Sequence, residues 1–117
     1  MRIEASRELV APAADVWALL AEPYHLSDWW PGYETIRPDR RGLAAGARWE
    51  IGRSRSPGLL RRPGASGLIV LSDIQPGRAL GWNDVEQAFA ARIEIEPEDG
   101  VTSAVVSLEA PWWRIRI

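Results

Sequence analysis

The chain has 117 residues, of which 46% are hydrophobic and 26% charged, with a formal net charge of −2 and no cysteine. These values are typical of one globular domain and exclude a disordered or fibrous protein. The slight negative charge argues against general nucleic-acid binding, and the lack of cysteine excludes disulfides, thiolate chemistry and cysteine-based zinc sites.

The first thirty residues predict a strand followed by two short helices. Residues 2–10 alternate between polar and apolar side chains, which is the period of a half-buried strand, and they have no signal-peptide core. In the stretch 11–23, Pro12 suits the first turn of a helix and the apolar residues recur at helical spacing. Residues 24–30 can form two more helical turns before Pro31-Gly32 ends them.

From residue 33 onward the pattern is that of β-strands separated by turns rich in Gly, Pro and Asp. Alternation is clearest around Phe89, Ala91, Ile93 and Ile95, because charged residues occupy the positions between them from Arg92 on. Such alternation is typical of an antiparallel sheet with one solvated face, so the chain belongs to the α+β class. Six strands are expected here, at residues 33–38, 47–53, 67–75, 79–85, 88–96 and 102–110.

Residues 52–67 interrupt this pattern with four arginines, four glycines and two prolines. The stretch is too long for a tight hairpin and predicts a loop of the kind that often carries function. We interpret its arginines, Arg53 among them, as a soluble loop tip. The alternative is that they touch an anionic membrane.

The segment "LVAPAADVWALLAEPYHLSDWWPGYE" resembles the opening of START-like proteins of the SRPBCC superfamily, which includes polyketide cyclases and lipid-transport domains. Further similarities are Gly46 before the strand with Trp49, the motif "PGRALGW", and "EPEDGVTSAVVSL" before the last expected strand. Together these features cover roughly residues 3–108. They are fairly specific for the fold and poorly specific for an activity.

The resemblance implies a helix-grip fold for a single domain spanning residues 1–117. In that fold a curved seven-stranded antiparallel sheet wraps around a long C-terminal helix, and two short helices follow the first strand. This chain has "APWWRIRI" in place of that helix. We therefore expect either further chain after Ile117 or a homodimer through the open sheet face. Without a cover, four aliphatic residues would face water: Ile93, Ile95, Val106 and Leu108.

The resemblance also implies a cavity for a small hydrophobic or amphipathic ligand of the lipid, polyketide or isoprenoid type. One of Trp29 and Trp30 is expected to line the cavity and the other to pack into the helix junction. The alternative is that both fill the core, and the sequence does not decide between the two rings. The predicted ligand-binding residues are Trp29, Trp30, Trp49, Ile51, Trp82, Phe89, Ala91, Ile93 and Val106.

Residues able to do chemistry are few. His25 is the only histidine, which excludes a histidine-rich metal site, and no nucleotide-binding glycine motif is present. His25 and Asp28 are candidates for proton transfer at the cavity mouth, although a surface or capping role is the commoner one for such residues. Tyr33 is a candidate to orient a ligand oxygen, or a half-buried aromatic residue. No metal and no cofactor are expected.

Three functions follow, and ligand binding without chemistry is the first. The second is an enzyme similar to polyketide cyclases and aromatases, in which the cavity folds a flexible chain. The third is an interaction domain similar to the chaperone-ATPase activators of the same superfamily. Two or more convergent titratable groups in the cavity would favour the enzyme. We expect a bacterial cytoplasmic protein without stable membrane insertion, because no apolar run approaches the ~20 residues of a membrane span.

Overall fold

The structure of the protein is a computed structural model, and it describes residues 1–53 and 66–110. The predicted loop at 52–67 falls almost entirely outside the described residues, and so does the C-terminal sequence "PWWRIRI".

The predicted order of elements is confirmed: one strand, two short helical segments, the second of which consists of η1 and α2, and six further strands. The strand and helix boundaries agree with the sequence patterns to within two residues. The elements are β1 (Arg2–Leu9), α1 (Ala13–Ala21), η1 (Pro23–His25), α2 (Leu26–Trp29), β2 (Tyr33–Arg37), β3 (Arg48–Arg53), β4 (Ser66–Gln75), β5 (Ala79–Asp84), β6 (Phe89–Glu98) and β7 (Val101–Glu109).

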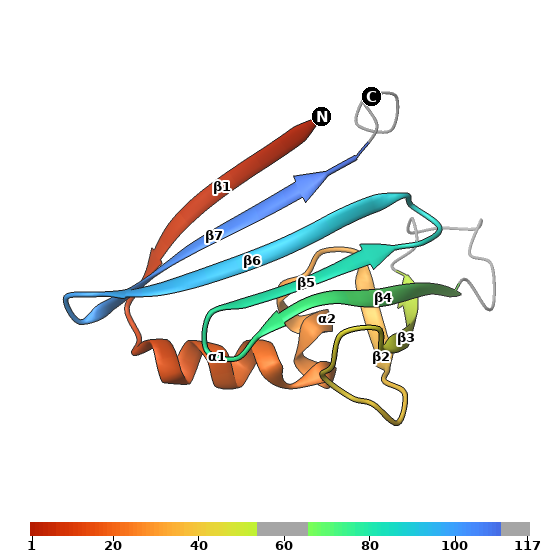
Figure 1. Ribbon diagram of the computed structural model, residues 1–117, viewed down its shortest axis with the longest axis horizontal. Coiled ribbons are helices and arrows are strands. Elements are labelled where there is room, and N and C mark those ends of the chain that lie inside the picture. The colour runs from red at the N-terminus through yellow and green to blue at the C-terminus, as the bar shows by residue number, and fades with distance from the viewer. Residues whose placement is uncertain (54–65, 111–117) are drawn as a thin grey trace.

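The seven strands form one curved antiparallel sheet in the order β1-β7-β6-β5-β4-β3-β2 (Figure 1). Strands β2 to β7 each pair with their neighbours in sequence, whereas β1 pairs with β7 at the far end of the described chain. The turn between β6 and β7 consists of Asp99 and Gly100, which both have positive φ angles. Two such residues suit the tight hairpin turn that matches strand twist. The α+β helix-grip-like architecture expected from the sequence is confirmed.

The sheet has two faces of different character, and helix α1 identifies them because it packs against β6 and β7. On the inner face, which carries the helices, side chains of the sheet form one buried core with Val16, Leu20 and Leu26. The buried inner-face side chains include Ile36, Trp49, Ile51, Ile69, Leu71, Leu80, Trp82, Ala91, Ile93, Ile95 and Ala104.

The expectation that Ile93 and Ile95 would face water is wrong. Both are buried, because α1 lies against β6 and β7 and brings Val16 and Leu20 into the same core. Val106 and Leu108 are half-buried. The predicted homodimer through this face and the predicted further chain after Ile117 stay predictions.

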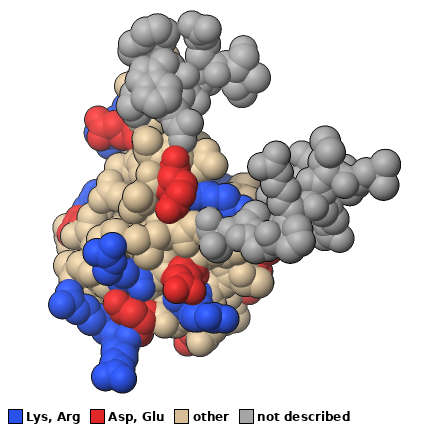
Figure 2. Space-filling view, turned by 90° about the vertical axis from the view of Figure 1, so that its right-hand side faces the viewer, with Lys and Arg blue, Asp and Glu red and all other residues tan. Residues whose placement is uncertain are grey.

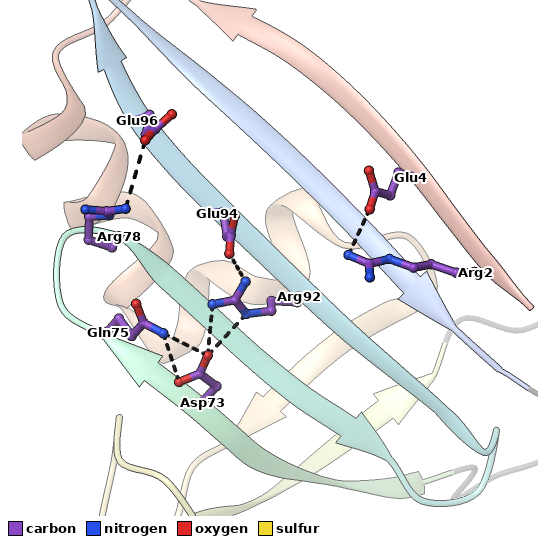
Figure 3. Close-up of polar contacts among 8 residues, drawn as sticks. All are labelled: Arg2, Glu4, Asp73, Gln75, Arg78, Arg92, Glu94 and Glu96. Carbon is purple, nitrogen blue, oxygen red and sulfur yellow. Dashed lines mark hydrogen bonds and ion pairs between the residues drawn. The ribbon is translucent and has the colours of Figure 1, made fainter.

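The outer face is polar and carries ion pairs, both within one strand and across the sheet (Figure 3). Arg92 on β6 binds Asp73 on β4 and also Glu94 on its own strand. Figure 2 shows acidic and basic side chains interspersed on one side of the molecule, not separated into a patch of either sign. No helix among the described residues is long and apolar enough to cross a membrane.

Two shallow hollows of about 110 and 280 Å³ are lined chiefly by residues of this outer face. Charged side chains and small residues line both, including Arg78 and Glu96 in the smaller one and Arg92 and Ser107 in the larger. They lie on the side of the sheet away from its tryptophans, so they are not the predicted cavity.

Candidate functional site

An aromatic cluster forms where α2 ends and β2 begins. Trp30 caps α2 by donating its backbone N–H to Leu26, and Gly32 then takes a φ of 93°, so the chain reverses into Tyr33. This reversal sets the ring of Trp30 4.8 Å from that of Trp82 and 6.0 Å from that of Phe89. The aromatic cluster consists of Trp29, Trp30, Tyr33, Trp82 and Phe89.

The two adjacent tryptophans have similar positions. The ring centroid of Trp29 lies 5.9 Å from that of Trp82, and both Trp29 and Trp30 meet Trp82 edge to face. Both are half-buried. The Nε1 of Trp29 is buried and has no hydrogen-bond partner among the described residues. The prediction that only one of them faces a ligand remains a prediction.

A hydrogen-bonded ionic group borders this cluster on the same inner face. The Asp84 carboxylate accepts hydrogen bonds from the Tyr33 hydroxyl (2.6 Å), from Nη2 of Arg53 (2.6 Å) and from the backbone N–H of Gln87 (3.0 Å). Nε1 of Trp82 donates to the Tyr33 hydroxyl at 3.3 Å. The Asp84 side chain is fully buried and that of Arg53 is 18% exposed. A buried carboxylate requires such partners.

Strand register explains how residues so far apart in sequence meet. Arg53 shares the inner face with Trp49 and Ile51, and Asp84 shares it with Trp82, because each follows its neighbour by two residues. Strand β4 lies between them and presents Gly67, where a Cβ would lie only 2.8 Å from Nη2 of Arg53. The missing side chain therefore leaves the space through which Arg53 reaches Asp84.

The ionic group holds each of its members in one protonation state. Burial raises the pKa of the Tyr33 hydroxyl, and the neighbouring Asp84 carboxylate raises it further. Burial alone would raise the pKa of Asp84, but hydrogen bonds from Arg53, Tyr33 and Gln87 outweigh it and hold that pKa below its usual value. Burial alone would lower the pKa of the Arg53 guanidinium, but the hydrogen bond and the negative charge of Asp84 outweigh this effect, so the pKa is raised.

The predicted ligand-binding residues all occupy the inner side of the molecule, at two depths. Five of them lie within the packed core and four are half-buried at its surface. The buried ones are Trp49, Ile51, Trp82, Ala91 and Ile93, and the half-buried ones are Trp29, Trp30, Phe89 and Val106. Their roles in binding stay predictions.

The three candidate catalytic residues are divided between two places. Nδ1 of His25 lies 2.8 Å from the Asp28 carboxylate, and both side chains are exposed at the surface. Tyr33 instead bonds to Asp84 and Trp82 in the interior. Within residues 1–53 and 66–110, no three histidine, aspartate or glutamate side chains gather to hold a metal ion.

Sequence reasoning missed Asp84 and misassigned Arg53. The interpretation of Arg53 as part of a soluble loop tip is wrong, because it belongs to β3 and pairs with a buried carboxylate. A signal was present in the alternation. Arg53 is in phase with Trp49 and Ile51, so an inward-facing charge on that strand required a partner of opposite charge.

Comparison with known proteins places the chain among solved structures of the same architecture. An NMR structure from Thermobifida fusca has a TM-score of 0.71 at 19% identity, covering 97% of this chain and 76% of that one. A crystal structure from Nitrosomonas europaea has a TM-score of 0.71 at 18% identity, covering 95% and 75%. The Aha1 dimer from Colwellia psychrerythraea has a TM-score of 0.65 at 14% identity, covering 95% and 77%. These identities support the fold alone.

No curated protein matches the sequence significantly. The family model described as polyketide cyclase / dehydrase and lipid transport matches residues 1–114, nearly the whole chain. With the helix-grip-like sheet, this match shows that the protein belongs to the polyketide cyclase / dehydrase and lipid transport family.

Proposed function

We propose that the protein binds a small hydrophobic or amphipathic molecule on the inner face of its sheet, at the aromatic cluster. The observation that carries this proposal is the half-burial of Trp29, Trp30 and Phe89 around the fully buried Trp82. Small-molecule sites are mostly apolar with a few polar groups that fix orientation. The aromatic cluster and the ionic group of Tyr33, Asp84 and Arg53 together have this composition.

The apolar surface continues from the cluster toward the edge of the sheet. Leu108 pairs with Ala91 on one side and with Ile3 on the other. Leu108 is half-buried and Ile3 is exposed, so aliphatic carbon extends along the inner face from β6 to β1. Contiguous apolar surface of this kind marks interaction sites in soluble proteins. It supports a ligand longer than one ring, such as a lipid, polyketide or isoprenoid.

A second candidate is a polyketide cyclase-like enzyme, which the convergence of Tyr33, Asp84 and Arg53 favours. General acid–base catalysis works best when the catalytic pKa lies near the working pH. Here the pKa of Asp84 is lowered and that of Tyr33 is raised, so neither group changes its protonation near neutral pH. The ionic group therefore suits orientation of a ligand better than proton transfer, and binding is the better supported function.

The proposal is tested with an environment-sensitive apolar dye whose binding alters tryptophan fluorescence. Phe89→Ala should weaken dye binding about tenfold, because a half-exposed ring of the cluster is removed. Tyr24→Ala is the matched control, since Tyr24 is an exposed aromatic residue on η1, outside the cluster. Undiminished dye affinity in a folded Phe89→Ala variant contradicts the proposal. Native mass spectrometry of the purified protein would show any co-purified molecule directly.

A further inference from the structure

The two edges of the sheet differ in how they are protected. Strand β2 forms one edge, and it is short, with a bulge between Tyr33 and Thr35. Strand β1 forms the other edge, and its pairing with β7 is regular along its whole length. Short strands and bulges keep a sheet edge from pairing with another strand, and β1 has neither. Among the described elements β7 is its one neighbour, and the other side of β1 is open (Figure 1).

The free edge of β1 is formed by the backbone groups of its even-numbered residues. The amino group of Met1 donates to the Ala110 carbonyl at 2.7 Å, and the Ala110 N–H donates to the Met1 carbonyl at 3.0 Å. Such an exchange recurs at every second residue of an antiparallel ladder, so the odd-numbered residues of β1 direct their backbone groups toward β7. The backbone N–H and C=O groups of the even-numbered residues therefore point away from the sheet, and they have no partner among the described residues. These residues are Arg2, Glu4, Ser6 and Glu8.

These outward groups restrict how a second copy of β1 can pair with the edge. In a dimer whose two-fold axis is perpendicular to the sheet, the two strands run antiparallel, and each outward-facing residue lies opposite another one. Within Arg2–Leu9, two registers meet this condition and pair all but one residue of the strand. One register places Arg2 opposite Glu8 of the second copy. The other places Glu4 opposite that Glu8.

The charges select the first of these registers. By symmetry it brings Arg2 and Glu8 together twice, with both side chains on the outer face, whereas the second register sets glutamates opposite each other twice, which is unfavourable. Within the described part of the chain Glu8 has no ion pair, and Arg2 pairs with Glu4 of its own strand, at the surface (Figure 3). A guanidinium has several N–H donors, so Arg2 can bind Glu8 of the second copy as well.

The side chains on the inner face also suit the first register. It places Ala5 opposite itself at the axis and Ile3 opposite Arg7 of the second copy. These pairs exchange no backbone hydrogen bonds, so their side chains lie close together. Ile3 is 47% exposed, and the aliphatic stem of Arg7 would cover it while the guanidinium stays in water.

We propose that the protein forms a homodimer by antiparallel pairing of β1 with β1 of a second copy, with Arg2 opposite Glu8. The two sheets then join into one. This dimer differs from the one predicted from the sequence, because it uses the edge of the sheet and leaves the inner face and its aromatic cluster open. Its interface is a single pair of strands, so we expect a weak dimer with a dissociation constant of about 10–100 µM.

The test measures the molar mass of the protein by analytical ultracentrifugation from about 1 µM to about 1 mM, a range that brackets the expected dissociation constant. Arg2→Glu and Glu8→Arg should each weaken the dimer about tenfold, because each creates two like-charge pairs across the axis. The double variant Arg2→Glu/Glu8→Arg restores opposite charges and should return to within about threefold of the wild-type value. Arg78→Glu is the matched control, since it makes the same change in net charge and breaks an exposed ion pair away from β1. It should leave the dissociation constant unchanged.

Amide hydrogen exchange locates the interface on β1. The N–H groups of Glu4, Ser6 and Glu8 should exchange rapidly in dilute protein and slowly in concentrated protein, whereas those of Ala5 and Arg7, which face β7, should exchange slowly in both. Ser6→Pro removes an outward N–H that makes no bond to β7, so it should prevent dimerisation and keep the fold. If Ser6→Pro does not fold, the charge reversals still decide.

A wild-type protein that stays monomeric at about 1 mM would overturn the inference. A dimer that is unaffected by the two charge reversals, or is not restored by the double variant, would also overturn it, because its interface would then be another surface such as the inner face. Slow exchange at Glu4, Ser6 and Glu8 in dilute, monomeric protein would show that another part of the same chain covers the edge, with the same consequence. None of these results bears on the dye test of the proposed function.

Discussion

The two faces of the sheet each carry an arginine that reaches across one strand to an aspartate on the next. On the inner face Arg53 passes Gly67 on β4 to Asp84 on β5. On the outer face Arg92 on β6 reaches Asp73 on β4, across Gly81 on β5. The inner side chains are 18% and 0% exposed, and the outer ones 33% and 43%.

The comparison shows that the same pair of residue types has different roles according to burial. The outer pair is one of several ion pairs on a solvated surface. Water can replace its hydrogen bonds there, so the pair contributes little to stability. The inner pair excludes water from Asp84, so each partner depends on the other. Of these two pairs, the inner one is joined through Tyr33 to Trp82 of the aromatic cluster, and the proposed ligand site lies there.

The largest expected difference between the faces is in stability. Asp84→Ala should lower the free energy of unfolding by about 3 kcal/mol, because it leaves Arg53 and Tyr33 without their shared partner. Asp73→Ala on the outer face should cost no more than about 1 kcal/mol. Urea unfolding of both variants measures the two values. Equal losses would mean that burial does not distinguish the pairs.

The glycines beneath the two arginines give a second test. Gly67→Ala places a Cβ 2.8 Å from Nη2 of Arg53 and 2.9 Å from Oε1 of Glu86, so the guanidinium must shift from Asp84. We expect a loss of about 2 kcal/mol in stability, as for overpacking elsewhere. Gly81→Ala is the control, since its nearest atom is the Ser72 hydroxyl at 3.1 Å, and it should cost less. Thermal unfolding of the two variants ranks them.

The pH dependence of stability should follow the inner group. Folding lowers the pKa of Asp84. Its contribution to the free energy of unfolding is therefore complete above about pH 4, the pKa of an aspartate in the unfolded chain, and is lost as the pH falls further. Folding raises the pKa of Tyr33. Its contribution to the free energy of unfolding is therefore complete below about pH 10, the pKa of a tyrosine in the unfolded chain, and declines as the pH rises further.

Tyr33→Phe should remove part of the decline in stability at alkaline pH. At neutral pH it should lower the free energy of unfolding by about 1 kcal/mol, because Asp84 loses one hydrogen-bond donor. Tyr24→Phe should leave the loss of stability at alkaline pH unchanged, because Tyr24 is exposed and its described hydrogen bonds, to Glu22 and Ser27, do not involve this group. Denaturant unfolding across pH measures both. An alkaline limb unchanged in Tyr33→Phe would contradict the assignment.

The smallest effect is expected at the exposed His25–Asp28 pair. His25→Ala should change stability by less than about 0.5 kcal/mol and leave dye affinity unaltered, because both side chains of the pair are exposed at the surface. A large loss of dye affinity would instead place His25 at the mouth of the site, as its sequence neighbours first indicated.

The sequence predicted the strands well because alternation is a local signal. Phe89, Ala91, Ile93 and Ile95 repeat with a period of two whatever they pair with, and the structure places them on the inner face. The ionic group was not predicted, because it depends on which strands are neighbours. Arg53 and Asp84 are 31 residues apart and meet through β4, whose pairing with β5 includes an irregularity between Leu71 and Asp73.

The alternation within each strand nevertheless indicated that both charged residues of this group face inward, although it did not indicate that they meet. Arg53 is in phase with Trp49 and Ile51, so it faces inward. Asp84 is in phase with Leu80 and Trp82, so it also faces inward, with a charge of opposite sign. The contacts of each tryptophan were harder to predict from the sequence. Trp29 and Trp30 are adjacent in sequence, yet both rings contact Trp82 because the last turn of α2 carries them to one place.

The position of β1 has a consequence for how the molecule folds. Strands β2 to β7 can form as a series of hairpins while the chain is being synthesised, since each pairs with its sequence neighbour. Among the described strands β1 pairs with β7 alone, and the amino group of Met1 donates to the carbonyl of Ala110. Of the seven strands of this sheet, the first to be synthesised is thus the last that can pair, and until then both its edges remain open to wrong pairing.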